Sequence, residues 1–259
     1  MRTIAFIIPS IAILVIVMAV VCPLRAKGLY LDLPGFFSVV DTARTFVTIR
    51  HADLQRGEGR ASIISGELAI RPRKRVRVRL GLLYPNIQRE QGIVHGVGDG
   101  FIHATARIFG DTLDASGFFL RGDARIPIGS GGLRPLSFGS LDGGLGVEFR
   151  RRTMLLSLRL VATYTLVGQR VKEGPFTHRN FLLTGYTVDF PFGDRASIQF
   201  SGFYVRFRGG GSREAYLITA RYRLSDALDL CTSGMLEAGN DGNRVFNSLV
   251  AIAVMSRFP

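Results

Sequence analysis

Strict alternation of apolar and polar residues, repeated along most of the chain, is the feature that most restricts its possible folds. In residues 75–84 the arginines occupy odd positions, whereas Val76, Val78 and Leu80 occupy even ones. Successive side chains of a strand face opposite sides of a sheet, so this pattern predicts a strand with one apolar and one polar face. Comparable segments occupy residues 154–165, 216–224 and 246–258, and weaker ones occupy residues 45–52, 61–71, 101–110, 113–126, 144–150, 179–190, 195–207 and 228–237. The sequence therefore predicts an all-β protein with about twelve antiparallel strands.

The lengths of these segments and of their connections indicate a barrel that crosses a membrane. Each segment is close to the ~9–11 residues that a tilted strand needs to span a bilayer. Short connections are expected at residues 72–74, 110–112, 150–152, 191–195 and 225–227, and mostly longer ones, rich in Gly, Pro, Asn and Asp, at residues 85–99, 127–142, 166–177, 209–213 and 238–244. Short turns at one rim and long loops at the other are typical of bacterial outer-membrane barrels, so we expect a transmembrane β-barrel with both termini in the periplasm. A secreted β-sandwich and a closed soluble barrel are the alternatives.

The N-terminal segment indicates export from the cytoplasm. An uncharged apolar run over residues 4–21 is typical of a secretory signal peptide. We expect residues 1–26 to be this signal peptide, cleaved after Ala26, and an uncleaved membrane anchor is the alternative. Residues 27–44 fit no strand well, and we expect them to form a periplasmic arm or a plug in the lumen, followed by the barrel over residues 45–259.

The polarity of the strand faces predicts which residues line the interior. In a barrel surrounded by lipid the more continuous apolar face lies outside, and closure of the barrel pairs the backbone N–H and C=O groups without water. The opposite faces then line the lumen, with the side chains of Arg77, Arg79, His103, Arg107, Arg121, Asp123, Arg125, Glu148, Arg150, Arg159, Arg221 and Arg223. We expect Asp123 and Glu148 to offset part of the arginine charge, because a buried arginine row without acids is costly. Since arginines outnumber acids in this set, the sequence predicts a positive lumen that favours anions.

Candidate sites for catalysis, cofactors or metals are weak. None of the four histidines forms a His-x-Ser pair on one strand face, and His103 with Thr105 comes nearest. Gly96 and Gly98 lack the third glycine of a dinucleotide-binding loop, because Phe101 stands at its position. Two cysteines are too few for a cysteine-based zinc site, and the net charge of +13 is carried by arginines within strands, without an aromatic platform for nucleic acid. We therefore expect no enzyme activity, no cofactor, no metal and no nucleic-acid partner.

Two short motifs link the chain to a family of channels. Gly96-Val-Gly-Asp-Gly100 opens one alternating strand, and Arg125-Ile-Pro-Ile-Gly129 closes the next hairpin. In these motifs the chain resembles the outer-membrane channel family associated with the meta-cleavage pathway of phenol degradation, although Ile128 stands where that family has a threonine. The resemblance implies a transport barrel that admits hydrophobic or aromatic compounds.

Together these features predict a channel of the bacterial outer membrane for passive uptake of a small solute, with hydrophobic or aromatic compounds as one solute class. The expected partners are membrane lipid, the solute, and the outer-membrane assembly machinery, which would bind the C-terminal strand ending at Phe258. A barrel enzyme acting on lipid, as a hydrolase or acyltransferase, and a structural surface barrel are the alternative functions.

Overall fold

The computed structural model describes residues 45–56, 59–89, 92–110, 116–129, 141–168, 171–173, 176–178, 180–208, 211–238 and 248–258. The predicted signal peptide and the predicted arm or plug lie outside the described residues. The described residues contain no helix that is long and apolar enough to span a membrane.

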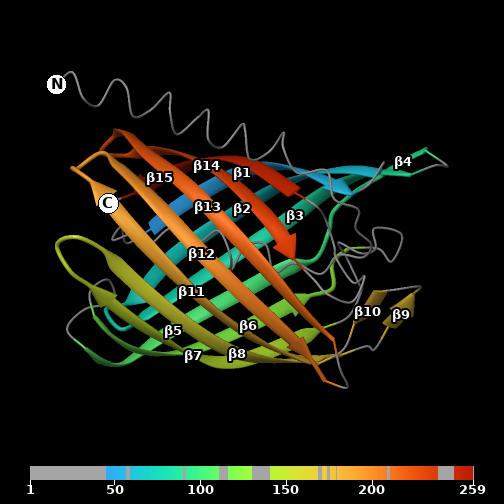
Figure 1. Ribbon diagram of the computed structural model, residues 1–259, viewed down its shortest axis with the longest axis horizontal. Helices are drawn as coiled ribbons and strands as arrows, with labels where there is room; N and C mark the ends of the chain where they lie inside the picture. The colour runs from blue at the N-terminus through green and yellow to red at the C-terminus, as the bar shows by residue number, and fades with distance from the viewer. Residues whose placement is uncertain are drawn as a thin grey trace.

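Twelve long antiparallel strands of the described residues form a closed barrel (Figure 1). Each strand pairs with its neighbours along the chain, and the first strand also pairs with the last, which closes the barrel. The barrel strands are β1 (Thr45–Arg56), β2 (Gly59–Arg73), β3 (Val76–Arg89), β5 (Gly100–Gly110), β6 (Gly117–Ile126), β7 (Asp142–Arg152), β8 (Ser157–Val167), β11 (Phe181–Phe192), β12 (Ala196–Phe207), β13 (Ser212–Ser225), β14 (Leu228–Ala238) and β15 (Ser248–Phe258). The prediction of an all-β antiparallel barrel of about twelve strands is confirmed.

Three short strands extend one end of the barrel. The strand β4 (Gly92–His95) pairs with the end of β3, and β9 (Val171–Glu173) pairs with β10 (Phe176–His178) in a separate two-stranded sheet. Both additions project from the end of the barrel that lies away from the C-terminus (Figure 1). They belong to the connections that the sequence predicts to be long.

The opposite end carries the short turns and both ends of the barrel. Thr45 of β1 is the pairing partner of Phe258 of β15 at this rim. Short turns at residues 74–75, 193–195 and 226–227 join strands at the same rim, which we call the short-turn rim. The position of this rim in the periplasm stays a prediction.

Two connections differ from the sequence-based prediction. The turn expected at residues 150–152 lies instead at residues 153–156, because the ladder continues until Arg152 pairs with Ser157. The Thr153 hydroxyl accepts a hydrogen bond from the Leu156 N–H (3.2 Å), which closes this later turn. The loop expected from residue 85 also starts later, because β3 continues to Arg89 by pairing with β4.

The outer face of the described strands is an apolar band. Between the strand ends it carries no Asp, Glu, Lys or Arg among the described residues; outward charges such as Asp53, Glu214 and Arg151 lie near the rims. The six tyrosines of the described part all point outward, at 38–49 % exposure: Tyr84, Tyr164, Tyr186, Tyr204, Tyr216 and Tyr222. An outward apolar band flanked by aromatic side chains is typical of barrels that lie in lipid.

Candidate functional site: the barrel interior

Apolar side chains gather in the half of the barrel interior toward the long-loop end, and most of the interior arginines lie in the half toward the short-turn rim. Toward the long-loop end, inward side chains from nine strands pack into one cluster, which we call the inner apolar cluster: Ala52, Leu54, Ile63, Leu83, Val161, Phe181, Leu183, Phe203, Phe207, Ala215, Leu217, Met235, Leu249 and Ala251. Leu217, Met235 and Leu249 are each 1 % exposed. The barrel is therefore tightly packed with apolar groups at this level.

Two phenylalanine rings in the apolar half lie against glycines of the neighbouring strand. A Cβ atom added to Gly81 would lie 1.7 Å from Cζ of Phe101, and one added to Gly185 would lie 2.5 Å from Cδ1 of Phe203. Each phenylalanine is the direct cross-strand partner of its glycine. The missing glycine side chains thus let the rings lie close to the barrel wall.

The residues predicted to line the lumen lie on the inward faces of their strands. Arg77, Arg79, Arg121, Arg150, Arg159 and Glu148 are buried, and the half-buried members of the set are His103, Arg107, Asp123, Arg125, Arg221 and Arg223. Most of them lie in the half of the barrel nearer the short-turn rim. Their role as the lining of a transport path stays a prediction.

The two predicted acids pair with the arginines beside them. Asp123 accepts hydrogen bonds from Nε (2.8 Å) and Nη2 (3.1 Å) of Arg121, and it also contacts Nδ1 of His103. Glu148 pairs with Arg150, whose guanidinium lies 4.4 Å from the centre of the Phe119 ring. These contacts offset part of the arginine charge within the barrel wall.

Several interior charges are absent from the sequence-based set. Glu67 of β2 lies 3.6 Å from Arg79, and Glu237 of β14 lies 3.9 Å from Arg213. Both acids occupy inward positions of alternating strands, so their alternation could have revealed them. Asp99, which accepts a hydrogen bond from Arg125 at 2.8 Å, lies in the irregular residues 96–99, where no alternation is present to reveal it.

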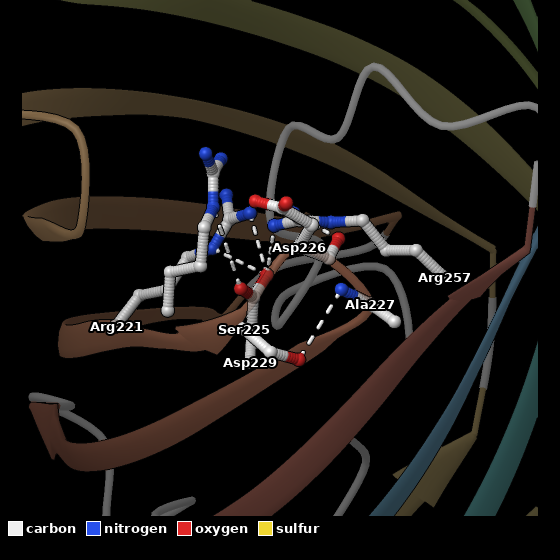
Figure 2. A network of polar contacts seen from close by, with 7 residues as sticks. Arg221, Ser225, Asp226, Ala227, Asp229 and Arg257 are labelled. Atoms are coloured by element: carbon white, nitrogen blue, oxygen red, sulfur yellow. Dashed lines mark hydrogen bonds and ion pairs between the residues drawn. The ribbon is translucent and has the colours of Figure 1, made fainter.

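Asp229 is the centre of a cluster of charged side chains near the short-turn rim (Figure 2). This carboxylate is 0 % exposed and accepts a hydrogen bond from Nε of Arg221 at 2.8 Å. Arg223 lies 3.9 Å away, and Arg257 of the last strand pairs with the same carboxylate. Figure 2 shows Arg221 and Arg257 approaching the carboxylate from opposite sides, so one acid links β13, β14 and β15 near the short-turn rim.

A pocket of about 730 Å³ lies at the short-turn rim, and we call it the rim pocket. It is bounded by β7, β8, β11, β12 and β13 and by the turns at residues 153–156 and 193–195. Its charged lining residues are Arg152, Arg195, Arg221, Arg223, Asp189 and Asp194. Arginines therefore outnumber acids at this end of the interior as well.

A second, much smaller cavity lies deeper in the barrel. It has about 20 Å³, and polar atoms from Thr48, Arg50, Glu67, Thr219 and Ser233 contribute to its lining. A cavity of this size holds about one water molecule when several polar partners surround it. In the part of the chain that the structure describes, no group of three His, Cys, Asp or Glu side chains is arranged to hold a metal ion.

Comparisons with known proteins place the fold among outer-membrane β-barrels. No protein-family model and no curated protein sequence matches this sequence. An outer-membrane channel from Pseudomonas putida F1 is similar, with a TM-score of 0.64 and 11 % identity over 88 % of this chain and 100 % of that chain. The NanC porin has a TM-score of 0.62 and 9 % identity over 82 % of this chain and 100 % of its own. The KdgM porin in complex with disordered oligogalacturonate has a TM-score of 0.57 and 9 % identity over 83 % of this chain and 99 % of its own. At these identities the likeness shows the fold, that of an outer-membrane β-barrel, and these structures are channels or porins rather than enzymes.

Proposed function

We propose that this protein is a bacterial outer-membrane channel for the passive uptake of a small solute. The observation that carries the proposal is the inverted polarity of the closed barrel, which has an apolar outer band and an interior that contains arginines and paired acids. A soluble barrel would place its apolar face inside and its charges in water. The channel and porin structures that share the fold support the same conclusion.

The proposal includes an orientation in the membrane. The short-turn rim, with Thr45 and Phe258, faces the periplasm, and the long loops face the outside, as in other outer-membrane barrels. Residues 1–26 serve as the export signal, and the outer-membrane assembly machinery binds the strand that ends at Phe258. Membrane lipid contacts the apolar band.

The interior favours small anions or compounds with aromatic rings. Arginines outnumber acids on the inward faces, which makes the potential of the interior positive. One porin of similar fold was solved with oligogalacturonate, an acidic sugar chain. The resemblance to phenol-pathway channels and the inward phenylalanines support aromatic compounds as a second class.

Swelling of proteoliposomes tests this function. Vesicles containing the folded full chain are placed in isosmotic solutions of a pentose or of a tetrasaccharide. Twelve strands lie between the ~8 of a filled barrel and the ~16–18 of an open pore, so the pentose is expected to enter and the tetrasaccharide to be excluded. Vesicles with heat-denatured protein are the control. Swelling no faster than in this control, with protein shown to be folded, would contradict the proposal.

A further inference from the structure

We infer that the solute is an organic anion with an apolar body, such as an aromatic sulfonate or carboxylate; this inference rests on the proposed channel function. The inference comes from the arrangement of the inner apolar cluster and the arginine-rich region one after the other along the barrel axis. A solute that crosses the barrel must pass the inner apolar cluster and the arginine-rich half in series. The path therefore selects for both properties in one molecule.

The inner apolar cluster disfavours strongly hydrated solutes. Leu217, Met235 and Leu249 are each 1 % exposed, so a passing molecule must displace them and contact apolar groups on several sides. A small hydrated ion or sugar that passes such a constriction loses part of its water shell there, so it passes more slowly than a solute with an apolar body, which loses little. Met235 is suited to this displacement because its unbranched side chain has three rotatable bonds.

Two aromatic rings at this level provide flat contact surfaces along the wall. The rings of Phe101 and Phe203 lie against Gly81 and Gly185, which keeps them close to the sheet. Aromatic pairs gain stability beyond simple area burial when they stack with an offset or meet edge to face. A solute with an aromatic ring matches this lining better than an aliphatic polar solute of the same charge.

The arginine-rich half and the rim pocket favour a negative head group. Arg152, Arg195, Arg221 and Arg223 line the rim pocket against Asp189 and Asp194. Asp229, which does not line the pocket, pairs with two of these arginines, Arg221 and Arg223, and even with this third acid counted the arginines are in excess. Guanidinium groups bind carboxylate or sulfonate oxygens through paired N–H donors. The volume of about 730 Å³ lies within the range of pockets that hold small organic molecules.

Permeability ratios in planar bilayers test the inference with permanently charged probes. Reversal potentials are measured for the folded full chain with benzenesulfonate, isethionate and phenyltrimethylammonium, which are an apolar anion, a hydrophilic anion and an apolar cation. We expect benzenesulfonate to be about tenfold more permeant than either of the other two ions, a ratio that corresponds to about 1.4 kcal/mol.

Two double variants test the contributions of the inner apolar cluster and of the rim arginines separately. Leu217→Asn with Met235→Gln is expected to bring benzenesulfonate and isethionate close to equal permeability while the preference over the cation remains. Arg152→Gln with Arg195→Gln, both exposed at the rim, is expected to weaken the preference over the cation and to leave the ratio of the two anions unchanged. Should the first variant fail to fold, the single change Met235→Gln is expected to lower the ratio of the two anions in the same direction.

The outcomes distinguish this inference from the proposed function. Equal permeability of the two sulfonates, or of benzenesulfonate and the cation, in a conducting wild-type protein would overturn the inference and leave the channel intact. A folded wild-type protein that passes none of the three probes and no pentose would contradict the channel itself.

Discussion

Asp229 holds together three arginines that would otherwise repel one another inside the barrel. Its carboxylate is fully buried and lies between Arg221, Arg223 and Arg257. Breaking a buried ion pair by removing one partner leaves an uncompensated charge, which is far more costly than losing a surface pair. This residue is therefore expected to be important for stability although it contributes no apolar contact.

Asp229→Asn is expected to destabilise the barrel by about 3 kcal/mol, because it removes a buried charge that pairs with three guanidinium groups. Urea unfolding in lipid vesicles measures the loss. Asp226→Asn is the matched control, because Asp226 is exposed in the adjacent turn. Its backbone oxygen accepts a hydrogen bond from Arg257, and this contact does not depend on the Asp226 side chain (Figure 2). Equal losses for the two variants would show that the cluster does not stabilise the fold.

Gly81→Ala is expected to destabilise the barrel by about 1–3 kcal/mol, because the new Cβ overlaps the Phe101 ring and forces it away from the wall. Gly66→Ala is the control, since a Cβ at Gly66 meets no atom within 4 Å. Adding Phe101→Leu to Gly81→Ala is expected to recover part of the loss, and the double-mutant cycle measures this coupling. Additive effects of the two changes would contradict the direct contact.

The sequence could predict individual interior residues only where alternation marks them. Inward positions such as Arg77 and Arg121 follow from their place in a regular strand, and the buried acids Glu67 and Asp229 follow from the same rule. Their pairing partners do not follow, because partners depend on strand register. Asp229 lies opposite Arg223 on one side and Met255 on the other, which brings Arg257 within reach. Asp99 carries no such signal, since it lies outside a regular strand.

At the scale of the strands, alternation predicted the elements well and their ends less well. The twelve predicted segments correspond to the twelve barrel strands. The turn after β7 lies three residues later than predicted, because arginines at residues 150–152 resemble a polar turn but continue the ladder with β8. Hydrogen bonding to the neighbouring strand determines where a strand ends, and amino-acid composition predicts that position only indirectly.

Ile218→Arg is expected to hinder assembly of the barrel, because Ile218 faces outward near the middle of β13 and an arginine at the bilayer midplane costs about 2–4 kcal/mol. Ser197→Arg is the control, since Ser197 faces the rim pocket beside Arg221 and an added arginine there remains solvated. Resistance of the folded band to unfolding in unboiled detergent gels reports assembly. The same loss of folded protein in both variants would contradict the assigned faces.

At the scale of the whole molecule, closure of the sheet gives the barrel an apolar outer face and a charged inner face. The pairing of β1 with β15 leaves the barrel without a free edge, so the outer apolar band can contact lipid while backbone groups stay paired. The interior then concentrates the charges of many strands in one narrow space. The proposed selection by charge therefore depends on the assembled barrel, and no single strand provides it.

The reversal potential in a potassium chloride gradient tests the central claim of a passive channel with a positive interior most directly. We expect the folded wild-type protein in planar bilayers to conduct with a preference for chloride over potassium, since the interior arginines outnumber the acids. The preference is expected to weaken toward molar salt, where the screening length falls to about 3 Å. A preference for potassium, or folded protein that passes neither ions nor small solutes, would contradict the account.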